Sequence, residues 1–162
     1  MSALKKIAPY LYPGPAGTLR GDTALLLGRI FFGGLMLAGH GWMKLSNFSA
    51  IADRGFPDPL GFGSTLSLAL ATGAEFFAAL AVVLGFLTRL SLIPLIITML
   101  VATFLVNLGK VPSWGAIPAD ADKLNALIVP IELSLLYLVG YIILLLTGPG
   151  RFSVDGALLH KR

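Results

Sequence analysis

Long runs of hydrophobic residues dominate the chain, and they predict helices that cross a membrane. The four runs are Thr23 to Leu45, Ser64 to Phe86, Leu90 to Leu108 and Asn125 to Thr147. Each is near the ~20 residues that a helix needs to span about 30 Å of hydrocarbon. The strict alternation of polar and apolar residues that is typical of a membrane barrel is absent from these runs. We therefore expect an all-α membrane protein with a four-helix transmembrane bundle.

The connections between the runs indicate how the helices are arranged. Only residues 87–89 separate the second run from the third, so these two helices are expected to be antiparallel neighbours. The longer connection over 46–63 predicts one short interfacial helix that ends at a turn near Gly55 and can form a lid. The connection before the fourth run predicts an aromatic anchor at Trp114 and a helix cap at Asp120.

Lys and Arg are unevenly divided between the two sides of the predicted bundle. The side with both chain ends carries Lys5, Lys6, Arg20, Arg89, Arg151, Lys161 and Arg162, and the other side carries Lys44, Arg54, Lys110 and Lys123. Because cytoplasmic loops carry the excess of positive charge, both termini are expected in the cytoplasm. The first run is too long for a signal peptide and contains Arg29, so it is expected to be retained. The predicted organisation is a lead over 1–22, a transmembrane domain over 23–147 and a C-terminal turn and tail over 148–162.

Composition agrees with the membrane assignment and excludes several classes of function. Of the 162 residues, 56% are hydrophobic and 12% are charged, whereas a soluble domain carries about 25% charge. The net charge of +4 reflects a shortage of all charges, so no nucleic-acid partner is expected. With no cysteine in the sequence, disulfides, thiolate metal sites and a thiol redox relay are excluded for this chain. No metal site and no haem are expected.

Five ionisable residues lie within the predicted spans: Arg29, His40, Lys44, Glu75 and Glu132. An unpaired charge at the centre of a membrane helix costs at least about 2.5–3.5 kcal/mol, so each of them is a candidate functional residue. Arg29, His40 and Lys44 follow a helical spacing that places them on one face of the first helix. That face is expected to point into the bundle.

Matching the depths of these residues predicts how they pair. Glu75 is expected to form a structural ion pair with Arg29, and Glu132 is expected to meet His40 or Lys44. Asn107, near the outer end of the third helix, is expected to hydrogen-bond into the same outer cavity. His40 and Glu132 are then the candidates for proton transfer or catalysis, and Lys44 and Asn107 for substrate binding.

Simpler roles for the same residues stay open. A buried ion pair such as Arg29–Glu75 commonly fixes the packing of helices without taking part in chemistry. Lys44, near the end of a span, can extend its ammonium group to the lipid headgroups. His40 can be an interior histidine whose hydrogen bonds are satisfied within the bundle.

An ordered set of motifs resembles a known family. The set comprises Gly28-Arg29, His40-Gly41, Lys44-Leu45, Glu75, Gly85-Phe86-Leu87-Thr88-Arg89, Glu132 and the tail Gly148-Pro149-Gly150-Arg151-Phe152-Ser153-Val154-Asp155. Over roughly residues 23 to 157 it is similar to the DoxX family of small bacterial membrane proteins. The resemblance implies a multi-pass protein of the bacterial inner membrane, with Arg151, Ser153 and Asp155 in a cytoplasmic turn motif. That turn can also be a helix stop with a basic anchor and no chemistry.

The resemblance implies an oxidoreductase component that binds a quinone or a similar apolar redox molecule, because relatives are connected with thiosulfate:quinone oxidoreductase and with quinone stress. His40, Glu132 and Lys44 would face the quinone, and partner subunits would deliver the electrons. Two alternatives stay open. One is a non-enzymatic membrane scaffold that assembles a larger complex or a homo-oligomer. The other is a small proton-linked transporter, although matching broken helices in two halves are absent from the sequence.

Overall fold

The computed structural model describes residues 19–110 and 120–160, and it confirms the all-helical membrane fold. Four helices are long and apolar enough to cross a membrane: Leu19–Ser46, Ser64–Leu84, Thr88–Asn107 and Ala121–Thr147. They lie within a few residues of the four apolar runs. No strand occurs in the described residues. Trp114 lies outside the described residues, as do the lead up to residue 18 and the last two residues.

The first three spans contain short segments with wider, π-helical turns. The first span is α2 (Leu19–Gly28), η1 (Arg29–Gly33), α3 (Gly34–Met36), η2 (Leu37–Gly41) and α4 (Trp42–Ser46). The second is α6 (Ser64–Thr72), η3 (Gly73–Ala78) and α7 (Ala79–Leu84), and the third is α8 (Thr88–Leu100) and η4 (Val101–Asn107). Such π turns are frequent at functional sites. Here they contain Arg29, His40 and Glu75.

Outside these three spans, the short connecting helix and the fourth span lie where the sequence predicts them, whereas the helix in the C-terminal tail was not predicted. The short helix expected between the first two spans is α5 (Phe48–Arg54). The fourth span is the single helix α9 (Ala121–Thr147), and it begins at the predicted cap, where the Asp120 carboxylate accepts a hydrogen bond from the Lys123 backbone N–H at 3.0 Å. A final helix, α10 (Val154–His160), follows the turn after α9.

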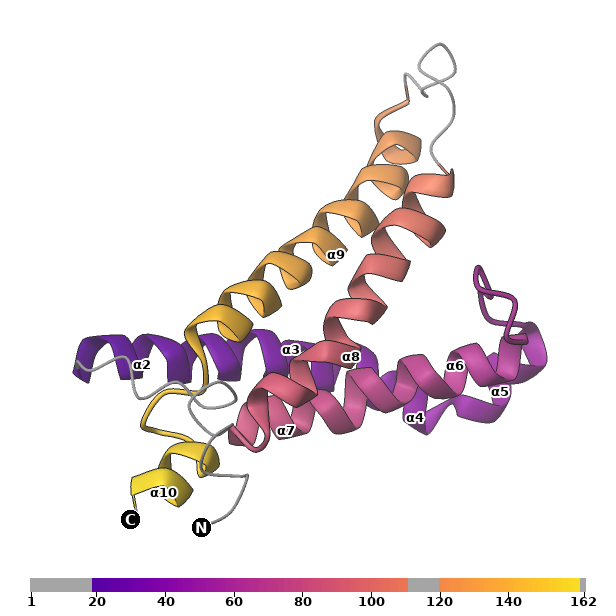
Figure 1. The fold of residues 1–162 in the computed structure, drawn as a ribbon. Helices are drawn as coiled ribbons and strands as arrows, with labels where there is room; N and C mark the ends of the chain where they lie inside the picture. Colours follow the sequence, from indigo (N-terminus) through magenta and orange to yellow (C-terminus); the bar gives the residue numbers. More distant parts are fainter. Residues whose placement is uncertain (1–18, 111–119, 161–162) are drawn as a thin grey trace.

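The four spans form two antiparallel pairs that diverge toward one end of the bundle (Figure 1). The first and second spans lie side by side, and α8 packs along α9. A Cβ atom on Gly41 would overlap the backbone of Glu75, so the first two helices approach closely only because this position is glycine. We name the diverging end, which holds residues 47–63, the loop end. We name the opposite end, which holds residues 85–88 and 148–155, the clamp end.

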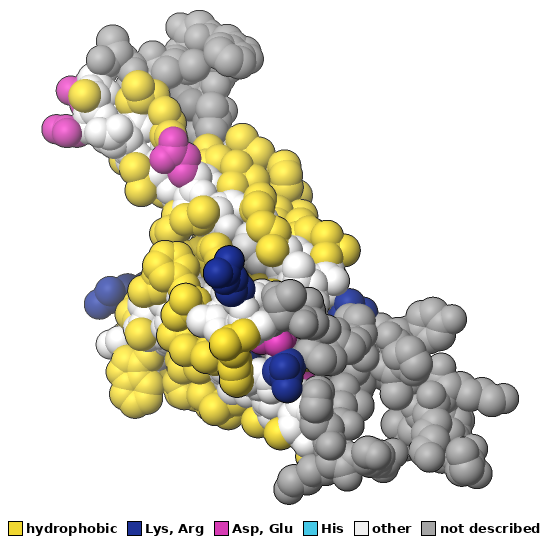
Figure 2. Space-filling view, turned by 90° about the vertical axis from the view of Figure 1, so that its left-hand side faces the viewer, with side chains coloured by type: hydrophobic (Ala, Val, Ile, Leu, Met, Phe, Trp, Pro, Cys, Tyr) yellow, Lys and Arg dark blue, Asp and Glu magenta, His cyan; other side chains and the backbone are white. Residues whose placement is uncertain are grey.

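The packed core lies between the pairs and near the clamp end. Its fully or nearly fully buried hydrophobic residues include Met36, Ala79, Val82, Leu92, Leu95, Tyr141 and Leu144. Toward the loop end, η4 and α9 are joined by polar contacts instead. The Thr103 hydroxyl donates to the Ser134 hydroxyl at 2.9 Å, and the Asn107 side-chain amide donates to the Pro130 carbonyl at 3.2 Å. Hydrophobic side chains cover most of the described surface in Figure 2, as expected for a molecule that faces lipid.

Candidate functional site

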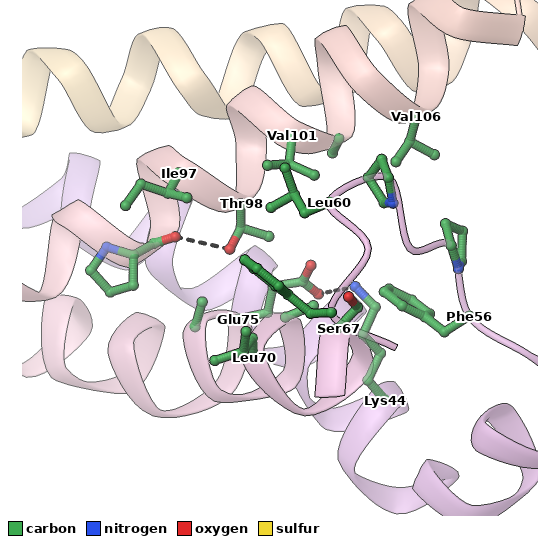
Figure 3. Close-up of a pocket in the computed structure, with 17 residues that line it drawn as sticks. Lys44, Phe56, Leu60, Ser67, Leu70, Glu75, Ile97, Thr98, Val101 and Val106 are labelled. Carbon is green, nitrogen blue, oxygen red and sulfur yellow. Dashed lines mark hydrogen bonds and ion pairs between the residues drawn. The ribbon is translucent and has the colours of Figure 1, made fainter. Parts of the chain in front are cut away.

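An apolar pocket opens between the second span, the third span and the loop over 55–63 (Figure 3). We name it the lateral pocket, and its volume is about 430 Å³. This volume falls within the range of about 300–1,000 Å³ that is typical of small-molecule sites. The lining residues are Lys44, Phe56, Pro57, Pro59, Leu60, Phe62, Ser67, Leu70, Ala71, Ala74, Glu75, Pro94, Ile97, Thr98, Val101, Ala102 and Val106.

The pocket opens on the side of the bundle that faces away from the packed core. Leu70 on α6 and Ile97 on α8 line it, and both side chains are also more than half exposed. Because both helices are membrane spans, the surface between them is in contact with hydrocarbon. A ligand that is dissolved in the bilayer therefore has direct access to the pocket.

Lys44 and Glu75 form an ion pair in the wall of the pocket. The Lys44 ammonium group, on α4, donates to Oε2 of Glu75, on η3. The side chains are only 14% and 5% exposed, so the pair is largely withdrawn from solvent. The Phe56 ring lies 5.7 Å from the Lys44 ammonium nitrogen, which is within the range of a cation–π interaction. Figure 3 shows the Lys44 and Glu75 side chains pointing toward one another beside this ring.

This ion pair leaves hydrogen-bonding capacity unused. Within the described residues, Lys44 donates one hydrogen bond and its ammonium group has three N–H donors. Glu75 uses Oε2, and Oε1 accepts no hydrogen bond from any described residue. A donor and an acceptor therefore stand together at the edge of an apolar pocket. A molecule with both kinds of group in one polar head is complementary to them.

The loop over 55–63 is fastened by one carboxylate, that of Asp58. It accepts hydrogen bonds from the Ser67 hydroxyl at 2.7 Å and from the backbone N–H groups of Phe62 and Gly63 at 3.0 and 2.7 Å. The Ser67 hydrogen bond is the main reason that the pKa of Asp58 lies below its usual range. Pro57 and Pro59, on either side of Asp58, line the pocket. The loop thus forms one wall of the pocket, and its role as a lid stays a prediction.

The expected pairing of Arg29 with Glu75 is wrong, because Glu75 pairs with Lys44. Arg29 donates instead to the Val83 carbonyl at 3.2 Å and to the Phe152 carbonyl. The predicted pairing assumed that the midpoints of the first two helices lie at the same depth in the membrane. In the structure they are offset, since Gly41 rather than the middle of the first span faces Glu75. This offset, together with the length of the Lys44 side chain, brings the two charges together.

Arg29 belongs to a polar cluster at the clamp end, which we name the clamp: Asp22, Arg29, residues 85–88 and residues 148–155. Asp155 is its centre and is 3% exposed. Its carboxylate accepts hydrogen bonds from the Leu87 N–H at 2.8 Å, the Thr88 N–H at 2.9 Å and the Thr88 hydroxyl at 2.8 Å. Asp155 therefore caps the start of α8 from a distant part of the chain.

The other residues of the predicted turn motif stabilise the same cluster. Ser153 donates to the Gly150 carbonyl at 2.6 Å and accepts from the Gly156 N–H at 2.9 Å. The Arg151 backbone N–H donates to Asp22 at 3.1 Å, while its side chain is exposed. Among the described residues, Nε of Arg29 and Oδ2 of Asp22 have no hydrogen-bond partner. These contacts tie the segment after α9 to the first three spans, which favours the structural interpretation of the motif.

His40 and Glu132 do not face one another across the bundle, contrary to the expected pairing. His40 is half-buried, and its ring packs edge-on against Tyr137 with the centroids 6.0 Å apart. Glu132 is five residues before Tyr137, which turns its side chain about 140° away around α9. Glu132 is exposed. Neither residue lines the lateral pocket, and Asn107 does not line it either.

Sequence reasoning named both members of the ion pair but missed the walls of the pocket. The candidate site residues were chosen mainly because they are ionisable and lie within the spans. Pro57, Pro59 and the aromatic residues of the loop carry no charge and lie outside the spans. One sequence feature pointed to the pairing, namely Gly41, since a glycine one turn from Lys44 permits close contact with a neighbouring helix.

Comparison with known proteins identifies the family of the chain. The sequence pattern of the DoxX family matches residues 24–108. The chain belongs to the DoxX family. The matched part of this DoxX protein contains Lys44, Glu75 and the loop over 55–63, and it ends before α9.

A curated relative extends the comparison. An uncharacterized membrane protein of Mycobacterium tuberculosis is 34% identical to this DoxX protein over 116 residues, which cover 65% of this chain and 69% of the relative. No solved structure matches the chain. The comparisons therefore establish a DoxX-family integral membrane protein.

Proposed function

We propose that this protein binds a membrane-dissolved molecule of the quinone class in the lateral pocket, as a component of an oxidoreductase. The observation that supports this proposal is the Lys44–Glu75 pair. It presents unused donors and an unused acceptor at the edge of an apolar pocket that opens between two membrane spans. The pair replaces His40 and Glu132 as the candidate ligand-binding centre.

The chemistry of a quinone fits this pair in both of its redox forms. A quinone carbonyl oxygen accepts a hydrogen bond from the Lys44 ammonium group. The hydroxyl of the reduced form donates one to Oε1 of Glu75. The apolar side chains of Leu70 and Ile97 offer a path for a hydrocarbon tail toward the bilayer. The role of this chain is to bind and orient the head, and a partner oxidoreductase exchanges the electrons.

Orientation is part of the same proposal. The first span begins and α10 lies at the clamp end, and the sequence assigns seven Lys and Arg residues to the side with both chain ends, against four on the other side. We therefore place the clamp end in the cytoplasm of a bacterial cell and the lateral pocket in the outer half of the inner membrane. A cysteine introduced at exposed Asp53 in α5 tests this orientation, because a membrane-impermeant thiol reagent would label it in intact cells.

The experiment that tests ligand binding is a titration of the purified protein in lipid nanodiscs with a short-chain ubiquinone analogue. Thermal unfolding is recorded at each concentration. A ligand that binds only the folded protein stabilises it by about 2.7 kcal/mol at a free concentration 100 times its Kd. Loss of a hydrogen bond to a charged group weakens binding by about 1.5–3 kcal/mol, so we expect Lys44→Met, which removes the donor to the quinone carbonyl, to bind about tenfold to a hundredfold more weakly.

The matched control is Lys123→Gln, which removes an exposed positive charge at the start of α9, away from the pocket. It should bind like the unmodified protein. Equal stabilisation of the Lys44→Met and Lys123→Gln variants would refute the assignment of the pocket. The absence of any stabilisation of the unmodified protein would refute the quinone class.

A further inference from the structure

A carboxyl group at membrane depth faces away from the rest of the molecule on α9. Glu132 is the twelfth of 27 residues in this helix, so it lies about 3 Å from the helix midpoint at a rise of about 1.5 Å per residue. Its side chain is exposed. Within the described residues it takes part in no ion pair and no hydrogen bond. Such an isolated group is costly in hydrocarbon, and a polar partner relieves that cost.

The buried side of α9 shows that Glu132 does not face a partner among the residues that the structure describes. Gly140 packs against the Phe32 ring of the first span, and the Ser134 hydroxyl accepts a hydrogen bond from Thr103 of the third. At 100° per residue, Glu132 is turned about 160° from Ser134 and about 80° from Gly140. It therefore lies outside the arc that packs on the other spans.

Glu132 stands in a continuous stripe that repeats every three or four residues, which we name the α9 stripe: Asn125, Val129, Glu132, Leu136, Val139, Ile143 and Leu146. All seven residues are exposed. The five apolar members are the most exposed large hydrophobic residues of this helix, from 53% to 72%. A spacing of three and four residues is the seam along which two helices pack at a small crossing angle. A polar residue within such a seam fixes the register of the two helices.

From this placement we infer that the α9 stripe is the interface with a second copy of this chain, and that the two Glu132 carboxyl groups hydrogen-bond to each other across a two-fold axis. In an isologous interface a residue near the axis meets its own counterpart. A protonated carboxyl group both donates and accepts, so it is complementary to itself. Asn125, one heptad away, has the same property. Both copies then satisfy their polar groups without any cation.

Cysteine crosslinking in native membranes tests this interface directly, because the natural chain contains no cysteine. Val139→Cys places a thiol one heptad from Glu132, and Phe77→Cys places one on the exposed face of the second span. With a mild oxidant, Val139→Cys should give a covalent dimer of this chain. Phe77→Cys is the matched control and should stay monomeric.

The role of the carboxyl group is tested in the Val139→Cys background. Glu132→Leu removes the hydrogen bond and suits a lipid-facing position, so the variant should fold and its crosslinked fraction should fall about tenfold. Glu132→Gln keeps a neutral donor and acceptor and should retain the dimer. An unchanged dimer in the Glu132→Leu variant, equal crosslinking at Phe77→Cys, or an adduct with a different protein in place of the dimer would overturn the proposal.

Discussion

The clamp and the lateral pocket both bury charged side chains between helices, but they use them differently. In the clamp, Asp155 accepts three hydrogen bonds through its two carboxylate oxygens. In the pocket, Glu75 accepts one, and Lys44 donates one of the three that it can make. Asp155 therefore has little capacity left for a ligand, whereas the ion pair at the pocket keeps capacity on both partners.

This difference separates structural from ligand-binding charges in a small membrane protein. A buried carboxylate whose hydrogen bonds are all made within the fold contributes to stability, and its loss leaves several donors unsatisfied. An ion pair with unused donors and acceptors beside an apolar pocket contributes less to stability and more to recognition. Substitutions in the clamp should therefore lower stability most, and substitutions at the pocket should mainly weaken ligand binding.

The largest effect on stability is expected from Asp155→Ala in the clamp. The substitution leaves the N–H groups of Leu87 and Thr88 without their acceptor and uncaps α8. With about 1–3 kcal/mol for each buried group left unsatisfied, we expect a loss of at least about 3 kcal/mol. Reversible unfolding in mixed micelles measures it. Asp53→Ala, at an exposed position in α5, is the control, and a similar loss in both variants would contradict the role of the clamp.

The next largest effect is expected from Gly85→Ala. Gly85 has a φ of 70°, and a Cβ atom there would overlap Arg29 and Ser153. Gly61 has a φ of 75°, but no atom lies within 4 Å of its added Cβ. Both substitutions incur about 1–2 kcal/mol of backbone strain, and only the one in the clamp adds overlap. The midpoint temperature of thermal unfolding should therefore be clearly lower for Gly85→Ala than for Gly61→Ala. An equal decrease in both variants would contradict close packing at the clamp.

A double-mutant cycle separates the pair at the pocket from the clamp. Lys44→Met and Glu75→Gln remove partners of one another, so their effects on the free energy of unfolding should differ from additivity by about 0.5–3 kcal/mol. Arg29→Met and Glu75→Gln should be additive within about 0.5 kcal/mol, because these residues have different partners. Coupling between Arg29→Met and Glu75→Gln, together with additivity between Lys44→Met and Glu75→Gln, would contradict this. Such a result would support the Arg29–Glu75 ion pair that the depths of these residues predict.

The smallest effect on stability is expected from Asp58→Asn in the loop. The amide keeps part of the hydrogen bonding, so we expect weaker ligand binding and nearly unchanged unfolding. The folded pKa of Asp58 is below its usual value, chiefly through the Ser67 hydrogen bond. Its contribution to stability is therefore present above the ordinary aspartate pKa of about 3.9 and is lost as the pH falls through the lower folded pKa. Hydrogen exchange of the Phe62 and Gly63 amides at decreasing pH measures this, and protection that is insensitive to acid would contradict the role of Asp58.

Much of the fold could be predicted from the sequence because lipid imposes simple rules. Apolar runs of sufficient length gave the four spans, and Asp120 marked the start of α9. Depth matching failed for Arg29 and Glu75, because it assumed that the helices align at their centres. The actual register depends on where glycines such as Gly41 allow close contact.

The face of α9 could not be predicted for a different reason. This helix is apolar on nearly all sides, so its sequence does not indicate which arc packs on its neighbours. Glu132 was assigned to the interior because a charge is costly in lipid, although an exposed carboxyl can be satisfied by another molecule. The walls of the lateral pocket, such as Pro57 and Leu60, belong to a connecting loop whose path depends on the contacts of Asp58.

Ligand binding in the lateral pocket is tested most directly by mapping where a photoreactive, short-chain quinone analogue attaches to the protein in lipid nanodiscs. Mass spectrometry of the digested protein locates the adducts. Quinone binding in the lateral pocket predicts adducts in the loop over 55–63 and in the third span over 94–106, which disappear with excess unlabelled quinone and in the Lys44→Met variant. Displaceable adducts beside His40 and Tyr137 instead, with none at the lateral pocket, would contradict it.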